Sequence, residues 1–338
     1  MSGEGIELLC NQAVRLAEHG GFDEAQAILR KAEAVAGNDK RLQGLIQMAF
    51  SCLYRLRGDF DEARGHGERA VDLLQRFGSA EENAEALSCL GTMECRRGKS
   101  ILAEGLCRRA LRLLSDSQNQ RVFVLAHWAL GYTLGNLERT VEAHEHLRTA
   151  LDAAGGLLSL REHGSLRSDL ALLCREKGDL DEALSLANQA LDAMKLAGGR
   201  NRVGDLYNTI GSIHARRCDR RTARDSYERA LAILGDDVTQ QAAESHYELA
   251  RLELEEGKPR QAFDRAHMAL KMACRLGSAM EEARACLVLG QVLMSLDRPQ
   301  EAVPYLRRAR DVFTEHELEQ SKIVTAEILR RAEGGGSK

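Results

Sequence analysis

Histidines, cysteines and clustered charges are the residues of this chain that could do chemistry, and their spacing predicts no catalytic or metal site. His144 and His146 lie two residues apart, so on one helix they would point about 200° away from each other and could not share a metal ion. The sequence has no His-Glu-x-x-His motif, no glycine-rich phosphate loop and no nucleophile elbow. We therefore predict that the protein is not an enzyme and holds no metal or other cofactor.

The nine cysteines are scattered along the chain, and no two of them form a Cys-x-x-Cys pair. Their odd number and their spacing argue against both a disulfide framework and a zinc site. Most of them fall on apolar stripes of predicted helices, where a free cysteine behaves as a small hydrophobic residue. Such cysteine usage suits a reducing compartment.

The densest basic cluster consists of five arginines, Arg216, Arg217, Arg220, Arg221 and Arg224. A cluster of this kind could bind phosphate groups. However, the whole chain has a formal net charge of −4, and Asp219 and Asp225 accompany these arginines. We therefore expect a solvated turn at Arg216–Arg224 and no nucleic-acid binding.

The elements that must position these residues follow from an internal repeat. Eight alanines recur at steps of 38 to 40 residues, another alanine follows each by seven residues, and a small residue precedes each by twelve. The first alanines are Ala25, Ala63, Ala103, Ala143, Ala183, Ala223, Ala262 and Ala302; the second are Ala32, Ala70, Ala110, Ala150, Ala190, Ala230, Ala269 and Ala309; the preceding residues are Ala13, Ser51, Gly91, Gly131, Ala171, Gly211, Ala250 and Gly290. Small residues let two helices cross with their axes about 8–10 Å apart. The pattern predicts a solenoid of helix pairs, an architecture that presents an extended binding surface.

A short turn joins the two helices of each predicted repeat. In the Lys177-Gly178-Asp179 segment, the glycine can end one helix in the left-handed conformation and the aspartate can cap the next. Glycine has the same place in four other repeats, at Gly20, Gly58, Gly98 and Gly257. Repeats four, six and eight have Glu138, Cys218 and Asp297 there, and we expect those three turns to close differently.

The predicted organisation is a single all-α solenoid over residues 1–333 and a flexible tail at 334–338. The eight repeats cover residues 6–43, 44–83, 84–123, 124–163, 164–203, 204–242, 243–282 and 283–316. A capping helix at 317–333 would cover repeat eight with Leu318, Ile323, Ile328 and Leu329. The N-terminus without a comparable cap and the linker-like tail indicate that the chain is part of a larger protein or leads into one.

Composition and hydropathy indicate where such a protein would reside. The chain is 44% hydrophobic but only 4% aromatic and has three prolines, as is typical of a long helical array. It begins without a basic segment followed by an apolar one, and no apolar run reaches the ~18 residues that span a bilayer. We expect a soluble cytoplasmic protein that has no membrane partner.

Four repeats carry a recurring apolar-glycine step, at Leu90-Gly91, Leu130-Gly131, Ile210-Gly211 and Leu289-Gly290. This step resembles the Leu-Gly step of the tetratricopeptide repeat family, and the alanine pairs match the second helix of that family. The resemblance covers residues 6–316, although the family's tryptophan and closing proline are missing and the period exceeds its usual length of about 34 residues. Longer repeats of this kind are similar to those of bacterial signalling regulators, peptide-pheromone receptors, kinesin light chains and Pins-like adaptors. The resemblance implies a right-handed superhelix whose first helices line a concave groove that binds a protein or peptide.

The resemblance also implies which side chains face that groove. They lie three residues before and one after the small residue of each first helix, and one turn later, which also places Cys52 and Arg55 there. We predict that the partner is contacted by Trp128, Tyr132, Leu172, Arg175, Asn208, Ser212, Tyr247 and Arg251. Trp128 would be an anchor for the partner, or it would fill the core between helices as the family's own tryptophan does. Asn208 would hold both polar groups of an extended peptide backbone, or it would be a solvated residue on a helix flank.

The predicted function is therefore a non-catalytic module that captures a protein or peptide segment in its groove. Arginines and carboxylates are mixed on the predicted groove face, which argues against a receptor that clamps a terminal carboxylate with lysines and asparagines. Two alternatives stay open. One is the sensor or regulatory arm of a signalling protein, such as a transcription regulator or signalling ATPase. The other is a self-assembling scaffold whose end repeats stack on those of a second copy.

Overall fold

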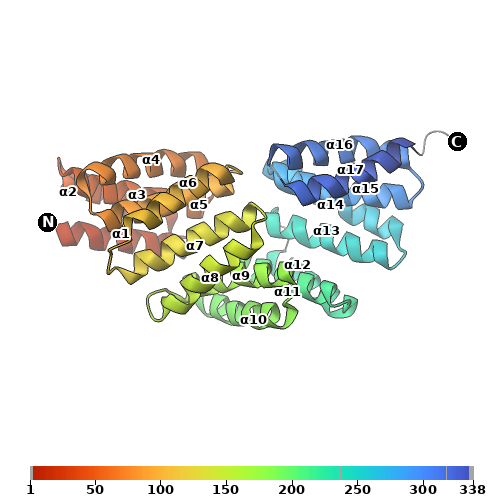
Figure 1. Ribbon diagram of the computed structural model, residues 1–338, viewed down its shortest axis with the longest axis horizontal. Coiled ribbons are helices and arrows are strands. Elements are labelled where there is room, and N and C mark those ends of the chain that lie inside the picture. The colour runs from red at the N-terminus through yellow and green to blue at the C-terminus, as the bar shows by residue number, and fades with distance from the viewer. Residues whose placement is uncertain (1–2, 236, 317, 335–338) are drawn as a thin grey trace. The chain divides into compact units, whose positions relative to one another are not determined.

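A computed structural model describes residues 3–235, 237–316 and 318–334. Within these residues the chain forms seventeen α-helices and no strand, which confirms the predicted all-α class. The helices follow one another as antiparallel pairs (Figure 1). They belong to two compact units, unit 1 at Met1–Leu173 and unit 2 at Cys174–Lys338.

The helices of unit 1 are α1 (Gly3–Glu18), α2 (Phe22–Ala36), α3 (Lys40–Arg57), α4 (Phe60–Phe77), α5 (Ala80–Arg96), α6 (Ser100–Leu113), α7 (Gln120–Asn136), α8 (Thr140–Ala154) and the first part of α9 (Leu160–Lys177). Unit 2 holds the end of α9 and α10 (Leu180–Ala197), α11 (Arg200–Arg216), α12 (Arg220–Leu234), α13 (Gln240–Glu255), α14 (Pro259–Leu276), α15 (Ala279–Ser295), α16 (Pro299–Glu315) and α17 (Glu319–Gly334). From the second repeat on, each predicted repeat boundary falls about one turn inside an odd-numbered helix. The predicted boundaries were placed where the apolar stripe of each first helix begins. The helix itself begins about one turn earlier, with largely polar residues.

The recurring small residues mark the places where the two helices of a pair cross. All sixteen repeat alanines are completely shielded from solvent. A methyl group added at Gly131 would lie 2.6 Å from the side chain of Leu147, and one added at Gly290 would lie 2.5 Å from that of Leu306. Because non-bonded carbon atoms need a separation of about 3.5–4 Å, glycine is the residue that fits these crossings. The steric prediction from the repeat pattern is confirmed.

The turns at Glu138, Cys218 and Asp297 show that one prediction was wrong. Their φ angles are 59°, 61° and 58°, so they adopt the left-handed conformation that Gly178 adopts at 90°. The amide of Glu138 donates to the carbonyl three residues before it at 3.1 Å, as the amide of Gly178 does. All these turns therefore close in the same way, and the residues with side chains carry a conformational cost of roughly 1 kcal/mol each.

Each unit has an inner layer of odd-numbered helices. In unit 1, α3 contacts both α1 and α5, and α5 contacts α7; in unit 2, α13 contacts α11 and α15. Among the described residues, α2, α4 and α6 make no comparable contact with one another, nor do α12, α14 and α16. A stack whose odd helices touch while its even helices spread apart is curved, with the odd helices on the inside.

The C-terminal helix α17 packs on α16 and so forms the cap that the sequence predicts. Leu329 is buried in the same core as Leu306 of α16, and Ile328 packs partly against that core. Ile323 is 63% exposed, which contradicts its predicted covering role. The buried stripe of α17 instead runs through Thr325, Leu329 and Ala332, and Ile323 lies outside that stripe. Of the predicted tail, Gly334 is the last residue of α17 and 335–338 lie outside the described residues.

Candidate functional site

We call the side chains of the odd-numbered helices that point away from the even-numbered ones the inner face. This face is strongly curved in unit 1. Burial raises the pKa of Glu18 at the end of α1, and the carboxylate of Glu162 on α9 raises it further, while Arg161 and Arg55 lower it. The charges at the end of α1 and at the start of α9 therefore act on each other across the space that the inner face of unit 1 borders.

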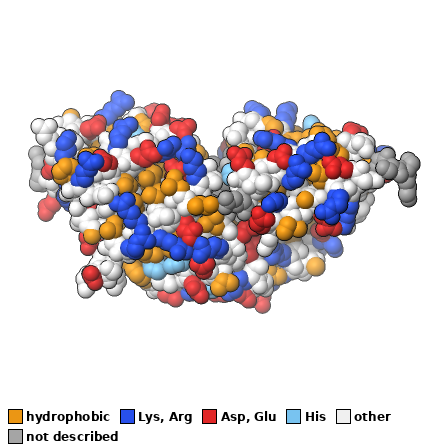
Figure 2. Space-filling model, turned by 45° about the horizontal axis from the view of Figure 1, so that its top comes forward, with side chains coloured by type: hydrophobic (Ala, Val, Ile, Leu, Met, Phe, Trp, Pro, Cys, Tyr) orange, Lys and Arg blue, Asp and Glu red, His pale blue; other side chains and the backbone are white. Residues whose placement is uncertain are grey.

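Charged groups of both signs line this space. The guanidinium of Arg121 on α7 donates to the carboxylate of Glu162 at 2.7 Å and to the carbonyl of Leu157 at 2.6 Å. Burial raises the pKa of Glu85 on α5, and Arg121 lowers it. Basic and acidic side chains are likewise interspersed on the face of each unit that Figure 2 shows.

Trp128 is bonded to a neighbouring inner helix and also keeps part of its surface exposed. The indole N–H of this α7 residue donates to the carboxylate of Asp169 on α9 at 2.7 Å, so it ties two inner helices together. Its side chain is nevertheless only half-buried. One edge of the ring is therefore used for packing between repeats, while part of the ring stays accessible on the inner face.

Tyr132 and Leu172 are the other predicted contact residues of unit 1. Tyr132 lies one turn after Trp128 on α7 and is half-buried, and the guanidinium of Arg96 lies 5.6 Å from the centre of its ring. A cation at this distance is attracted by the ring face. Leu172 on α9 is also half-buried. These two residues and Trp128 supply the apolar part of the candidate site.

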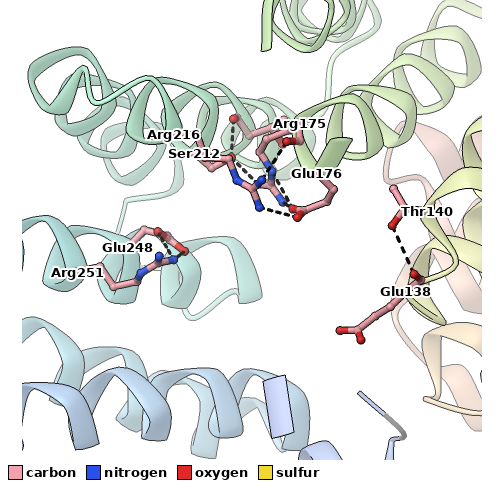
Figure 3. A network of polar contacts seen from close by, with 9 residues as sticks. Glu138, Thr140, Arg175, Glu176, Ser212, Arg216, Glu248 and Arg251 are labelled. Atoms are coloured by element: carbon pink, nitrogen blue, oxygen red, sulfur yellow. Dashed lines mark hydrogen bonds and ion pairs between the residues drawn. The ribbon is translucent and has the colours of Figure 1, made fainter. Parts of the chain in front are cut away.

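In unit 2, Arg175 is held inside a network of polar contacts (Figure 3). Its guanidinium donates to the hydroxyl of Ser212 at 2.5 Å and to the carboxylate of Glu176 at 2.6 Å. Arg216 donates to the carbonyl of Arg175 at 3.0 Å and also binds Glu176. The structure thus brings Arg175 and Ser212 together across α9 and α11, and their polar groups bind each other.

Arg251 and Tyr247 lie one turn apart on α13 and differ in accessibility. Arg251 is exposed and forms an ion pair with Glu248 at 3.0 Å, as Figure 3 shows. Tyr247 is only 5% exposed, and burial raises the pKa of its hydroxyl well above the ordinary value. The positive charge of Arg284 on α15 opposes this rise in the pKa. Tyr247 is therefore a core residue rather than the partner contact that the sequence predicts.

The prediction that Asn208 would hold a peptide backbone is contradicted. Its side chain is 1% exposed. The amide nitrogen donates to the carbonyl of Gln241 at 2.8 Å, and the amide oxygen accepts a hydrogen bond from Ser245 at 2.6 Å. Both polar groups of Asn208 are thus bound to α13, so neither is available to a partner. The alternative of a solvated residue on a helix flank is wrong for the same reason.

The arginine cluster at Arg216–Arg224 is neutralised by neighbouring repeats rather than by Asp219 and Asp225 alone. Its partners are carboxylates of the preceding and following helix pairs: Arg216 binds Glu176, Arg217 binds Asp181, Arg220 binds Glu255, and Arg224 binds Glu256. These ion pairs join successive turns of unit 2. The cluster is therefore better explained as part of the stacking of repeats than as a phosphate site.

The sequence analysis did not predict that most of these polar side chains form hydrogen bonds or ion pairs with side chains of the next repeat. Three contacts join residues 41 apart, namely Arg41 with Glu82, Arg121 with Glu162, and Trp128 with Asp169. Two others join residues 37 apart, namely Arg175 with Ser212 and Asn208 with Ser245. Complementary donors and acceptors at these two spacings are a signal that could have revealed the pairs.

None of the helices in the described part of the chain is long and apolar enough to cross a bilayer. Two models of the tetratricopeptide repeat match the sequence. One covers residues 162–236, and the other covers 128–195 and 247–315. Together the matches extend over slightly more than half of the chain.

The sequence is 24% identical over 293 residues to Protein KINESIN LIGHT CHAIN-RELATED 1 of Arabidopsis thaliana, a match that covers 82% of this chain and 48% of the relative. The chain thus spans about half the length of this curated relative. A Rap protein complexed with Competence and Sporulation Factor has a similar fold, with a TM-score of 0.70, 15% identity and 99% coverage of both chains.

A second similar structure is that of a signal transduction ATPase with numerous domains and a tetratricopeptide repeat sensor, from Pyrococcus horikoshii. It has a TM-score of 0.63 and 13% identity over 95% of this chain and 50% of that chain. The helix pairs, the buried small residues at each crossing and the matched repeat models all agree. The chain belongs to the tetratricopeptide repeat family.

Proposed function

We propose that the chain is a non-catalytic recognition module that holds a protein or peptide segment on the inner face of unit 1. The observation that carries this proposal is the placement of Trp128. Asp169 fixes its indole N–H, while part of the ring remains open on a curved face. A large aromatic ring that is already ordered loses little entropy on binding, as is typical of the residues that dominate protein interfaces.

The surroundings of Trp128 support a segment of mixed chemistry. Tyr132 and Leu172 add half-buried apolar surface, and Arg96 lies over the tyrosine ring. Arg121 and Glu162 provide a charged pair elsewhere on the same inner face. This combination suits a segment with an apolar side chain between polar ones.

The experiment that tests the proposal is affinity capture from a native lysate with the whole chain as bait, read out by mass spectrometry. Wild type is compared with Trp128→Ala and Tyr132→Ala. We expect one or more proteins that wild type retains and both variants lose, with an affinity loss of about 2 kcal/mol for an anchoring tryptophan. Circular dichroism verifies that each variant keeps the helical content of wild type.

Val141→Ala is the matched control, because Val141 is 68% exposed and lies on the outer helix α8 of the same unit. It removes apolar surface without touching the inner face and should retain every partner. Capture that is unchanged by both inner-face variants, or that is lost equally in the Val141 variant, contradicts the proposal.

A second function, the sensor arm of a larger signalling protein, is favoured by the match to only about half of the curated relative. The fold is also similar to that of the Pyrococcus protein, which has a tetratricopeptide repeat sensor. In this case the partner would be a regulatory domain whose activity depends on what the repeats bind. Fusing the chain to a reporter domain and measuring the activity of that reporter with and without the captured partner would distinguish a sensor from a simple adaptor.

A further inference from the structure

Two cysteines of the inner face lie on neighbouring helices. Cys52 is on α3 and Cys89 is on α5, two inner helices that pack together in unit 1. Both side chains are half-buried, whereas five of the other cysteines are buried. Each of the two thiols shifts the pKa of the other. The two cysteines are thus neighbours on packed helices, and each keeps part of its surface exposed.

The register of the repeats accounts for this proximity. Cys52 and Cys89 are 37 residues apart, which is the spacing of two contacts seen between other inner helices. Arg175 and Ser212 meet at 2.5 Å, and Asn208 meets Ser245 at 2.6 Å. Relative to the small residue of its own repeat, Cys52 lies one residue after, Arg175 lies four residues after and Asn208 lies three residues before. Those positions form one stripe of a helix.

The short side chains of Asn208 and Ser245 show how close the backbones come at this spacing. Their polar atoms reach 2.6 Å, although each side chain extends only a few bonds from its backbone. Cysteine has as many side-chain bonds as serine and one fewer than the amide oxygen of asparagine. The disulfide therefore forms when α3 and α5 hold the two Cβ atoms about 3.5–4.5 Å apart.

The two thiols differ in their readiness to ionise. Interaction with Cys89 and the nearby guanidinium of Arg55 lower the pKa of Cys52, against the opposing effect of burial. Interaction with Cys52 and burial raise the pKa of Cys89 well above its ordinary value. Of the two sulfurs, that of Cys52 therefore ionises more readily, and that of Cys89 stays a thiol. A thiolate beside a second thiol is the arrangement in which oxidation ends in a disulfide.

We propose that Cys52 and Cys89 are a reversible disulfide site that peroxide oxidises and that a dithiol reduces. The Cys52 thiolate attacks one oxygen of the peroxide, an S–O bond forms, the O–O bond breaks, and the other oxygen leaves as water after taking a proton. The sulfur of Cys89 then attacks the sulfenic sulfur of Cys52. The S–S bond forms, the S–O bond breaks, and the hydroxide takes the proton of Cys89 and leaves as a second water. Two thiols and one hydrogen peroxide thus give one disulfide and two waters.

The test oxidises the folded, full-length chain with one equivalent of hydrogen peroxide at neutral pH and then blocks the remaining thiols with iodoacetamide. Digestion with trypsin and Glu-C places Cys52 in residues 42–55 and Cys89 in residues 86–94, which separates Cys89 from Cys95. Mass spectrometry then identifies linked peptides. We expect the 52–89 link as the main product, removed by dithiothreitol, with Cys52 oxidised before Cys218 even though Cys218 is the more exposed of the two.

Two variants and a denatured control keep this proposal open to failure. In Cys89→Ser, Cys52 should stop at the sulfenic acid and react with dimedone, whereas in Cys52→Ser, Cys89 should stay reduced. Cys218→Ser should oxidise as wild type does. The proposal is overturned if Cys218 is oxidised first, if Cys52 proceeds to the sulfinic acid while Cys89 is alkylated, or if the urea-denatured chain forms the same link equally well. None of these outcomes depends on whether the inner face captures a partner.

Discussion

The indole N–H of Trp128 donates a 2.7 Å hydrogen bond to the carboxylate of Asp169, one repeat further along the inner layer. Trp128→Phe keeps an aromatic ring on α7 but removes this donor. Since hydrogen bonds to charged groups are worth about 1.5–3 kcal/mol and this one is partly open to water, we expect the free energy of unfolding to fall by about 1 kcal/mol. Urea denaturation followed by circular dichroism measures the loss.

A double-mutant cycle isolates the bond between these two residues. Asp169→Leu is combined with Trp128→Phe, and the loss in the double variant is compared with the sum of the two single losses. The pair is coupled if the double variant loses less than that sum. Additive losses would show that the ring contributes through packing alone.

The helix crossings predict opposite effects for two glycine substitutions. Gly131→Ala places a methyl group 2.6 Å from the side chain of Leu147, so α7 and α8 must move apart. We expect it to destabilise the fold by roughly 1–3 kcal/mol, as overpacking generally does. Ala150→Leu, at a fully buried crossing position on α8, should act in the same direction.

Gly105→Ala is the matched control, because Gly105 lies inside α6 and an added methyl group would meet no atom within 4 Å. Alanine is the better helix former by about 1 kcal/mol, so this variant should raise the midpoint of thermal unfolding. If Gly131→Ala and Gly105→Ala shifted the midpoint alike, close packing would not be the reason for the glycine at position 131.

The helix pairs could be predicted from the sequence because their cause is local and repeats eight times. Ala143 and Ala150 are completely buried, as is every other alanine pair, so a single steric argument covers all of them. The candidate site has no such redundancy. Asn208 looked available for a ligand because its partners, Gln241 and Ser245, lie on the inner helix of the next repeat. Nothing near Asn208 in the sequence reveals those partners.

Ile323 was misjudged for a related reason. A helix that packs along one side can bury only some of the apolar residues on its surface. In α17 the contact with α16 selects Leu329 and Ala332 and leaves Ile323 outside. The angle at which α17 packs on α16 determines which of its residues are buried. That angle cannot be deduced from the sequence of one helix. The groove positions taken from the family pattern were affected in the same way, since Tyr247 is core while Arg251 is exposed.

The left-handed turn residues predict a stabilising substitution. Cys218 has a φ of 61°, a region where a side chain costs roughly 1–2 kcal/mol and glycine costs nothing. Because glycine also loses more entropy on folding, we expect Cys218→Gly to stabilise by a net amount of about 0.5–1 kcal/mol. Cys218→Ala separates the effect of the backbone from that of the exposed thiol, since alanine keeps the strain. Equal midpoints of thermal unfolding for the glycine and alanine variants would show that the turn stores no strain.

Glu244 on α13 predicts how stability depends on pH. Burial, followed by the carboxylates of Asp205 and Glu281, raises its pKa to about 8, whereas a glutamate in an unfolded chain titrates at about 4.3. Between these values the folded chain binds a proton that the unfolded chain has lost. The stabilisation from this proton is therefore complete below about pH 4 and is lost as the pH rises to about 8.

Glu244→Gln removes this dependence, because glutamine stays neutral and keeps an oxygen that can accept the hydrogen bond from Asn208. We expect the variant and wild type to be similarly stable at acid pH, and the variant to gain steadily on wild type up to about pH 8. Urea titrations of both proteins at a series of pH values measure the difference. A difference that stays constant with pH would mean that the Glu244 carboxylate is already ionised in the folded protein, stabilised by the nearby Arg284, whose charge lowers the pKa of Glu244.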